Sequence, residues 1–159
     1  MRFCIKDEKW QFRDMQKDMT LQDVIADVKT FCDSYKIKVA DDPTTELTGD
    51  SIALRHRLME EENNEYLEAA EAGDLVEIAD ALGDQLYILC GTILSHGMQI
   101  VIEDVFAEIQ SSNMSKLGED GEPIVREDGK ILKGPNYFKP DISSILEKHS
   151  QIIKNEANV

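Results

Sequence analysis

The stretch over residues 55–91 combines the apolar spacing of helices with acids where apolar residues are expected. It predicts two helices, over about residues 51–72 and 75–95, joined by a tight turn. Gly73 suits the position after the first helix, where a positive φ is common. Asp74 can cap the second helix as the first residue of a capping box. So short a connection predicts an antiparallel pair.

The remaining pattern predicts further helices and a β-hairpin. Apolar spacing places the helices over about residues 21–35, 102–114 and 142–154. Ile124-Val125 and Ile131-Leu132 flank Asp128-Gly129, which is a strong short hairpin signal. The expected fold class is therefore all-α: a four- to five-helix bundle with an antiparallel core helix pair and a small β-hairpin.

The whole chain, residues 1–159, is expected to form one domain. The hairpin would lie within about residues 117–140, and the C-terminal helix at about 141–155. Residues 1–18 show no clear pattern, but four of them are available to pack on the domain or on a second chain: Phe3, Ile5, Trp10 and Phe12.

Acids of both paired helices lie on or beside the apolar arcs. At about 100° per residue, the first helix places Glu61, Glu62 and Glu65 within or beside its apolar arc. The second helix is apolar at most positions, so it is expected to be largely buried. Three of its few strongly polar residues share one face: Glu77, Asp80 and Asp84.

Folding the pair at its turn brings the two acidic strips level with each other. Glu65 lies opposite Asp80, each about 10 Å from the turn at 1.5 Å rise per residue. Glu62 lies within one residue of the level of Asp84, and Glu68 matches Glu77 nearer the turn. The strips face each other if both point to the same side of the pair.

Several carboxylates within a few ångströms must take up protons or bind a cation. Hard cations prefer carboxylate oxygen, so Mg²⁺ is the expected guest and Mn²⁺ is possible. No basic residue on these strips offers a structural salt bridge within the pair. The simpler alternative is a solvated acidic run at residues 60–62, with Glu77 serving only as a cap residue.

Composition narrows the classes of function. The chain has 159 residues, 42% of them hydrophobic, and a net charge of −15, which argues against nucleic-acid or membrane-surface partners. Three cysteines without C-x-x-C spacing support neither a disulfide framework nor a zinc knuckle. Cys32 and Cys90 are expected to be small core residues. The N-terminus does not resemble a secretory signal, and a cytoplasmic location is expected.

The motifs EENNE and EIAD resemble the E-E-x-x-E … E-x-x-D pattern of the all-α nucleoside triphosphate pyrophosphohydrolases. That superfamily includes MazG, the dimeric dUTPases and phosphoribosyl-ATP pyrophosphohydrolase. The resemblance implies Mg²⁺-dependent cleavage between the α- and β-phosphates, giving a nucleoside monophosphate and pyrophosphate. By the motif, Glu62, Glu65, Glu77 and Asp80 would be metal ligands, and Asp84 would be an added ligand or a neighbour of the ligands. Glu60 extends the acidic run, so which of the three consecutive glutamates binds the metal is open by one position. Glu61 would polarise the attacking water.

Residues outside the strips are needed to hold the phosphates and the base. NMSK and KGPNY are similar to a MazG-like subgroup, which makes four residues the candidates for substrate binding: Asn113, Lys116, Lys133 and Tyr137. For each cation the alternative is a surface charge. The family commonly assembles as homodimers or homotetramers and can borrow site residues from a neighbour, so a homo-oligomer is expected.

Two other enzyme activities and a non-enzymatic role are the alternatives. Phosphoribosyl-ATP pyrophosphohydrolase tends to be a shorter protein, and the additional N-terminal segment and hairpin argue against it without excluding it. A di-iron oxidoreductase is weak, because none of the three histidines follows an acid by three residues. A non-catalytic, metal-dependent nucleotide-binding bundle would use the same strips without turnover.

Overall fold

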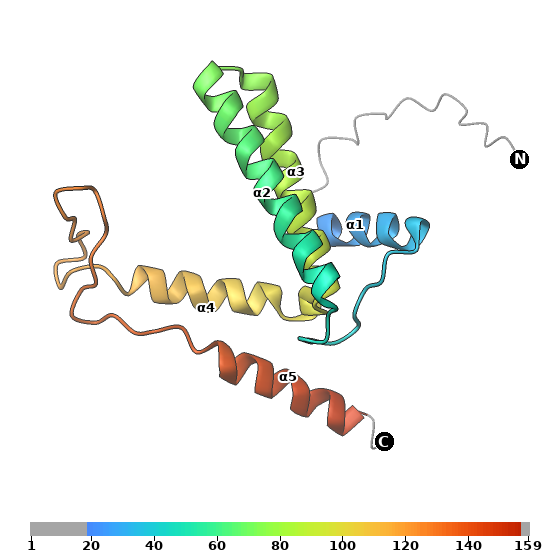
Figure 1. The fold of residues 1–159 in the computed structure, drawn as a ribbon. Helices are drawn as coiled ribbons and strands as arrows, with labels where there is room; N and C mark the ends of the chain where they lie inside the picture. The colour runs from blue at the N-terminus through green and yellow to red at the C-terminus, as the bar shows by residue number, and fades with distance from the viewer. Residues whose placement is uncertain (1–18, 157–159) are drawn as a thin grey trace, which may run out of the picture.

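The computed structural model describes residues 19–156, and these form an all-helical arrangement with no assigned strand (Figure 1). The predicted packing of Phe3, Ile5, Trp10 and Phe12 falls outside the described residues. In chain order the elements are α1 Leu21–Tyr35, α2 Gly49–Ala72, α3 Leu75–Ser95, the 3-10 helix η1 Met98–Ile100, α4 Ile102–Met114 and α5 Ile142–Glu156.

The antiparallel pair of α2 and α3 has the turn that the sequence predicts. Gly73 follows α2 with φ of 69°, and its N–H donates to the carbonyls of Ala69 and Ala70. Asp74 caps α3, because its Oδ1 accepts from the N–H groups of Val76 at 3.0 Å and Glu77 at 3.3 Å. One residue with positive φ and one capping carboxylate therefore reverse the chain and fix the level of each helix against the other.

The compact core lies where α1 packs on the C-terminal half of α3. Six buried residues form it: Ile25, Val28 and Cys32 from α1 with Cys90, Ile93 and Leu94 from α3. Cys32 and Cys90 are buried free thiols, as predicted. Burial raises the pKa of both thiols, which keeps them protonated and unreactive.

The expectation that α3 is largely buried is wrong for the single chain. Leu75 is 77% exposed, Leu82 is 50% exposed and Leu89 is 46% exposed. α2 covers one side of α3 and α1 covers its C-terminal half, but no other described helix packs along its N-terminal half. A long apolar helix face therefore stays open to solvent in one copy of the chain.

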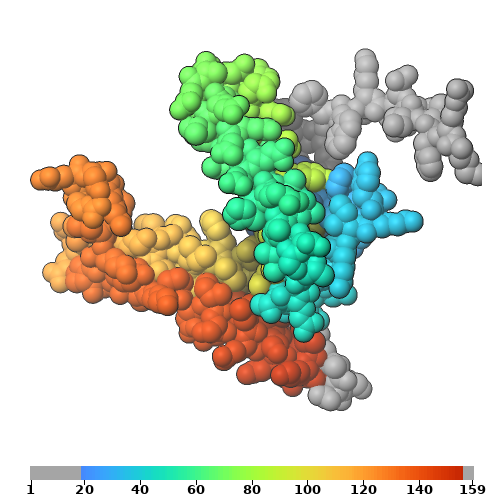
Figure 2. All heavy atoms as spheres, viewed as in Figure 1, coloured from blue at the N-terminus to red at the C-terminus, as the bar shows by residue number. Residues whose placement is uncertain are grey.

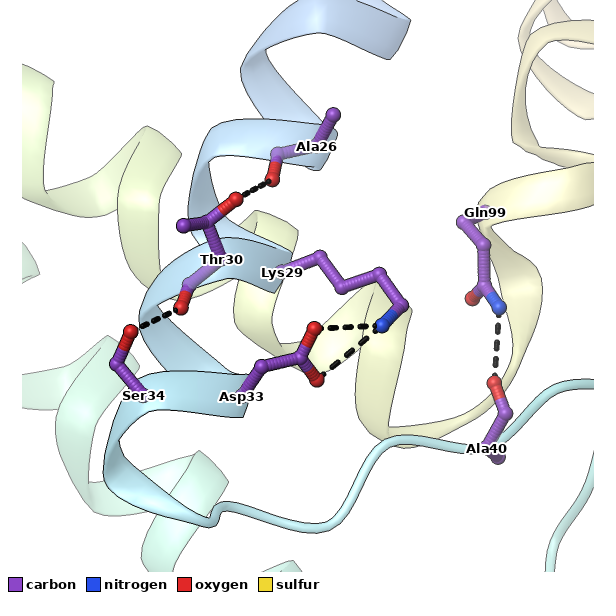
Figure 3. A network of polar contacts seen from close by, with 7 residues as sticks. All are labelled: Ala26, Lys29, Thr30, Asp33, Ser34, Ala40 and Gln99. Atoms are coloured by element: carbon purple, nitrogen blue, oxygen red, sulfur yellow. Dashed lines mark hydrogen bonds and ion pairs between the residues drawn. The ribbon is translucent and has the colours of Figure 1, made fainter.

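Polar contacts fix α1 and the loop that follows it (Figure 3). Inside α1, Lys29 Nζ pairs with the Asp33 carboxylate at 2.9 Å, and the Thr30 and Ser34 hydroxyls donate to carbonyls one turn back. Gln99 Nε2 donates to the Ala40 carbonyl at 2.8 Å, and the Ala40 N–H donates to the Leu94 carbonyl. The loop over residues 36–48 is thus attached to the end of α3.

The predicted β-hairpin is wrong. Among the described residues of this segment, Val125 and Ile131 form only an isolated antiparallel bridge. Backbone bonds from Arg126 to Lys130 and from Leu132 to Ile124 close a short loop around the Asp-Gly turn. The apolar side chains beside the bridge are exposed, so no burial supports a longer ladder, and two strands alone are only marginally stable.

α4 leads away from the α2–α3 pair, and α5 runs back alongside it (Figure 1). Buried Ser112 Oγ donates to the Phe138 carbonyl at 2.8 Å, which holds the segment after α4 against the end of that helix. Within residues 19–156, no helix has the length and apolar character needed to cross a membrane.

Gly97 is predicted to be the glycine least tolerant of substitution. Its φ is 67°, and a Cβ there would meet the Asp42 carbonyl oxygen at 2.0 Å. Gly97→Ala should lower the free energy of unfolding by more than the roughly 1–2 kcal/mol that a left-handed non-glycine residue costs alone. Gly121→Ala is the matched control, since φ is 79° and no atom lies within 4 Å. If urea denaturation shows that both variants lose the same free energy of unfolding, the predicted clash is contradicted.

Candidate active site

Glu62 is at the centre of the acidic strips. Its side chain is half-buried against α3, and Oε2 is sealed from solvent with no hydrogen-bond partner among the described residues. Burial raises the pKa of Glu62 above its usual range, and the negative charges of four neighbours raise it further: Glu65, Asp84, Glu61 and Asp80. The carboxylates predicted to face each other therefore lie within electrostatic reach of one another.

Two contacts between α2 and α3 give the level of this site. Gln85 Nε2 donates to the Glu62 carbonyl at 3.2 Å. Farther from the turn, Arg55 lies over Gly91, where a Cβ would meet Nη1 at 2.7 Å. Counted from either contact, Glu62 and Asp84 lie on the same level to within one residue, as the sequence predicts.

Glu77 differs from the other predicted ligands. It lies about one helical turn closer to Gly73 than Asp80 does. Its side chain is exposed, and its charge is not among those that raise the pKa of Glu62. Its backbone N–H donates to the capping Asp74. The part of Glu77 that the structure shows engaged is thus its backbone.

The acidic residues are of the kind that binds a hard cation, but their side chains do not converge on one point. Within residues 19–156, no group of three or more His, Cys, Asp or Glu side chains is placed to hold a metal ion. The sealed Glu62 oxygen nevertheless lacks a positive or hydrogen-bonding partner, which is costly for a carboxylate. A cation is a natural partner for that oxygen, and exposed neighbours such as Glu65 and Asp80 are free to rotate toward it.

The four predicted substrate-binding residues lie together at the end of α4. Lys116 Nζ donates to Asn113 Oδ1 at 2.7 Å, and Lys133 Nζ lies 4.1 Å from the centre of the Tyr137 ring. The Gly134 N–H donates to the Lys116 carbonyl at 2.9 Å, which joins the two pairs. We call these four residues the α4-end cluster.

Within one copy, the α4-end cluster does not meet the acidic strips. Figure 1 shows α4 running away from the α2–α3 pair, with the segment after it at the far end. The space-filling view shows the same separation on the molecular surface (Figure 2). In this arrangement, the α4-end cluster and the acidic strips of one copy do not form a common site.

Comparison with known proteins identifies the family. The model of the phosphoribosyl-ATP pyrophosphohydrolase family matches residues 20–113, which is more than half of the chain and includes both acidic strips. The chain belongs to this family. It is therefore a pyrophosphohydrolase, an enzyme that hydrolyses pyrophosphate bonds. Three members of the α4-end cluster lie beyond the matched residues: Lys116, Lys133 and Tyr137.

A solved structure is also similar to the chain. It is a protein from Exiguobacterium sp. 255-15 assigned as an NTP pyrophosphohydrolase, with 24% sequence identity over 84% of this chain and 97% of its own. The TM-score of 0.44 marks a loose overall likeness, so the family assignment rests on the sequence match. No curated protein matches the chain.

Sequence reasoning did not assign a role to Gln85 or Arg55. Both occupy the contact between α2 and α3 at levels that the turn already determines. The positions of these residues in the sequence could have indicated both contacts. Gln85 is one of the few polar residues on α3, and Gly91 lies as many residues from the turn as Arg55 does.

The crowding around Glu62 predicts an unusual response to its neutralisation. A folded-state pKa above the unfolded value means that ionised Glu62 destabilises the fold, and this destabilisation grows as pH rises through the unfolded and then the folded pKa. Without divalent cations at pH 7, Glu62→Gln should therefore melt at or above the temperature of the parent. Mg²⁺ should raise the melting temperature of the parent more than that of the variant.

Differential scanning calorimetry with and without MgCl₂ checks both parts. Glu71→Gln is the control, since Glu71 is exposed on α2 and not among the charges acting on Glu62. An equal Mg²⁺ response in the parent and both variants would contradict a cation bound at Glu62.

Proposed function

We propose that the chain is a Mg²⁺-dependent pyrophosphohydrolase that cleaves the α–β bond of a (deoxy)nucleoside triphosphate, giving the monophosphate and pyrophosphate. The observation that carries the proposal is the sealed, unpartnered Glu62 oxygen among four carboxylates on two facing helices. A housecleaning role against non-standard nucleotides fits such an enzyme. Mn²⁺ is suited to the same oxygen ligands as Mg²⁺.

Each acid has a distinct task in this proposal. Glu62, Glu65, Asp80 and Asp84 would hold the metal, and Glu77 would either join them or remain at the helix cap. A metal held there would neutralise charge on the phosphates and lower the pKa of a water molecule. Glu61 is exposed beside Glu62, and its carboxylate orients the attacking water and accepts its proton.

A second candidate substrate is phosphoribosyl-ATP, which fits the family match equally well. The matching model is described as phosphoribosyl-ATP pyrophosphohydrolase and includes both acidic strips. Hydrolysis of that substrate cleaves the same type of bond, so the acids would serve either reaction. Turnover of phosphoribosyl-ATP against nucleoside triphosphates distinguishes the two.

We also propose a homo-oligomer, a dimer or a tetramer, in which the α4-end cluster of one copy completes the acidic site of another. The two groups lie apart in one copy. The open apolar side of α2 and α3 forms a groove lined by Met59, Leu82, Leu86 and Leu89, which a second copy would cover. The phosphate charge would then meet Lys116 and Lys133 from the neighbouring copy.

Glu65→Gln should stay folded and lose at least about 100-fold in kcat, more than the 10–100-fold typical of residues that only support metal ligands. Pyrophosphate release is measured with Mg²⁺ across nucleoside and deoxynucleoside triphosphates, with phosphoribosyl-ATP included. Glu71→Gln removes the same charge from another face of α2 and should keep parental activity.

Two results would contradict this assignment. Full turnover by Glu65→Gln would remove Glu65 from the metal site. Mg²⁺ binding without turnover of any substrate would favour a nucleotide-binding role at this site.

Mixing two inactive variants tests the shared site. Glu65→Gln and Lys116→Ala should each be inactive alone. Once subunits exchange, one site in each mixed dimer has both groups intact, so random mixing should restore about a quarter of parental activity. Analytical ultracentrifugation confirms that both variants assemble like the parent. No recovery in exchanged mixtures would show that each copy uses its own cluster.

A further inference from the structure

A cavity of about 350 Å³ lies at the end of the α2–α3 pair remote from the turn. The loop after α1, the first turns of α2 and the last residue of α3 enclose it. Polar groups that line it include Lys38, Thr44, Thr48, Ser51, Arg55 and Ser95. Its volume is at the lower end of the range for small-molecule pockets, roughly 300–1,000 Å³.

Arg55 is the half-buried cation in the lining of this cavity. It is half-buried, and no hydrogen bond or ion pair joins its guanidinium to another residue of the described range 19–156. None of its nitrogens is among the sealed polar atoms, so they remain reachable from the cavity. A guanidinium has five N–H donors, and no other described residue accepts a hydrogen bond from those of Arg55.

The chain makes specific room for this side chain. Gly91 lies directly beneath Arg55, and a Cβ there would meet Nη1 at 2.7 Å. A glycine inside a helix costs roughly 0.5–1 kcal/mol relative to alanine. An alanine at position 91 would therefore displace the end of the Arg55 side chain.

Arg55 lies on the same side of the pair as the acidic strips. It precedes Glu62 by seven residues, which is two helical turns and about 10 Å along α2. On α3, Gly91 follows Asp84 by the same seven residues. A guanidinium without a partner thus lies in line with the carboxylates, within the length of a nucleoside triphosphate.

The chemistry of the cavity points to an oxyanion. The chain has 32 acidic and only 17 basic residues, yet none of the acids pairs with Arg55 among the described residues. Asp42 and Glu46 line the same cavity without reaching the guanidinium, and Lys38 adds a second cation. The planar guanidinium fork binds phosphate oxygens through two parallel hydrogen bonds, and the hydroxyl groups nearby can donate further ones.

We propose that the Arg55 cavity binds the terminal phosphates of the substrate and retains them as the leaving pyrophosphate. This assignment rests on the proposed function for its substrate, but the binding of pyrophosphate itself does not require turnover. Arg55 and Ser51 would hold the phosphates from α2. The substrate would then extend along the pair from this cavity to the acidic site.

Calorimetric titration of the full-length protein with inorganic pyrophosphate in EDTA tests the cavity without the metal site. The parent should bind. Arg55→Gln should weaken binding by about tenfold or more, the scale of a lost hydrogen bond to a charged group. Arg57→Gln is the matched control, because it removes the same charge from an exposed neighbour on α2. Gly91→Ala should also weaken binding, although it leaves every charge in place.

Three results would overturn the proposal: no binding by the parent, equal losses in Arg55→Gln and Arg57→Gln, or unchanged affinity in Arg55→Gln with a lowered melting temperature. The last would show that Arg55 only supports the fold. Nucleotide turnover is measured separately, where Arg55→Gln should raise KM about tenfold or more and lower kcat less. Absence of any nucleotide turnover with intact pyrophosphate binding would refute the proposed function and leave the cavity assignment standing.

Discussion

The contact between α2 and α3 determines everything else at the site. A positive φ at Gly73 and the Asp74 cap reverse the chain within two residues, so the level of each acid follows from its distance to that turn. Gln85 then joins the pair from the α3 side through its hydrogen bond to the Glu62 carbonyl, and Arg55 lies over Gly91. The same contact presses Glu62 against α3, and that burial is the main reason for its raised pKa.

Much of this geometry could be predicted from the sequence, because helices depend on local spacing and short turns leave few alternatives. The helix ends at Tyr35, Ala72 and Met114 match the predicted bounds, and so does the turn. The prediction of a β-hairpin was wrong because an Asp-Gly turn between apolar pairs reverses the chain but does not bury the side chains of the strands. Local sequence is enough to predict a turn, whereas a stable sheet also requires other elements to pack over its strands.

The candidate site was predictable to the extent that it depends on helical geometry. The level of Glu62 with Asp84 required only residue counts, whereas the remoteness of the α4-end cluster depends on the direction in which α4 leaves η1. The prediction that α3 is largely buried was wrong for a related reason. Apolar composition shows that a face will be covered, but it does not say whether the same chain covers it, and here Leu82 and Leu89 remain open.

The Gly73 turn also limits how this protein can vary in length. One residue added between Glu65 and Asp80 would rotate one strip by about 100° and shift it by about 1.5 Å, separating the carboxylates. The segment around Gly121 and Gly129 is exposed, and its length does not set the position of one helix against another. Related chains should therefore gain and lose residues most freely in the loop between Lys116 and Lys133, while the interval between the two acidic strips keeps a constant length.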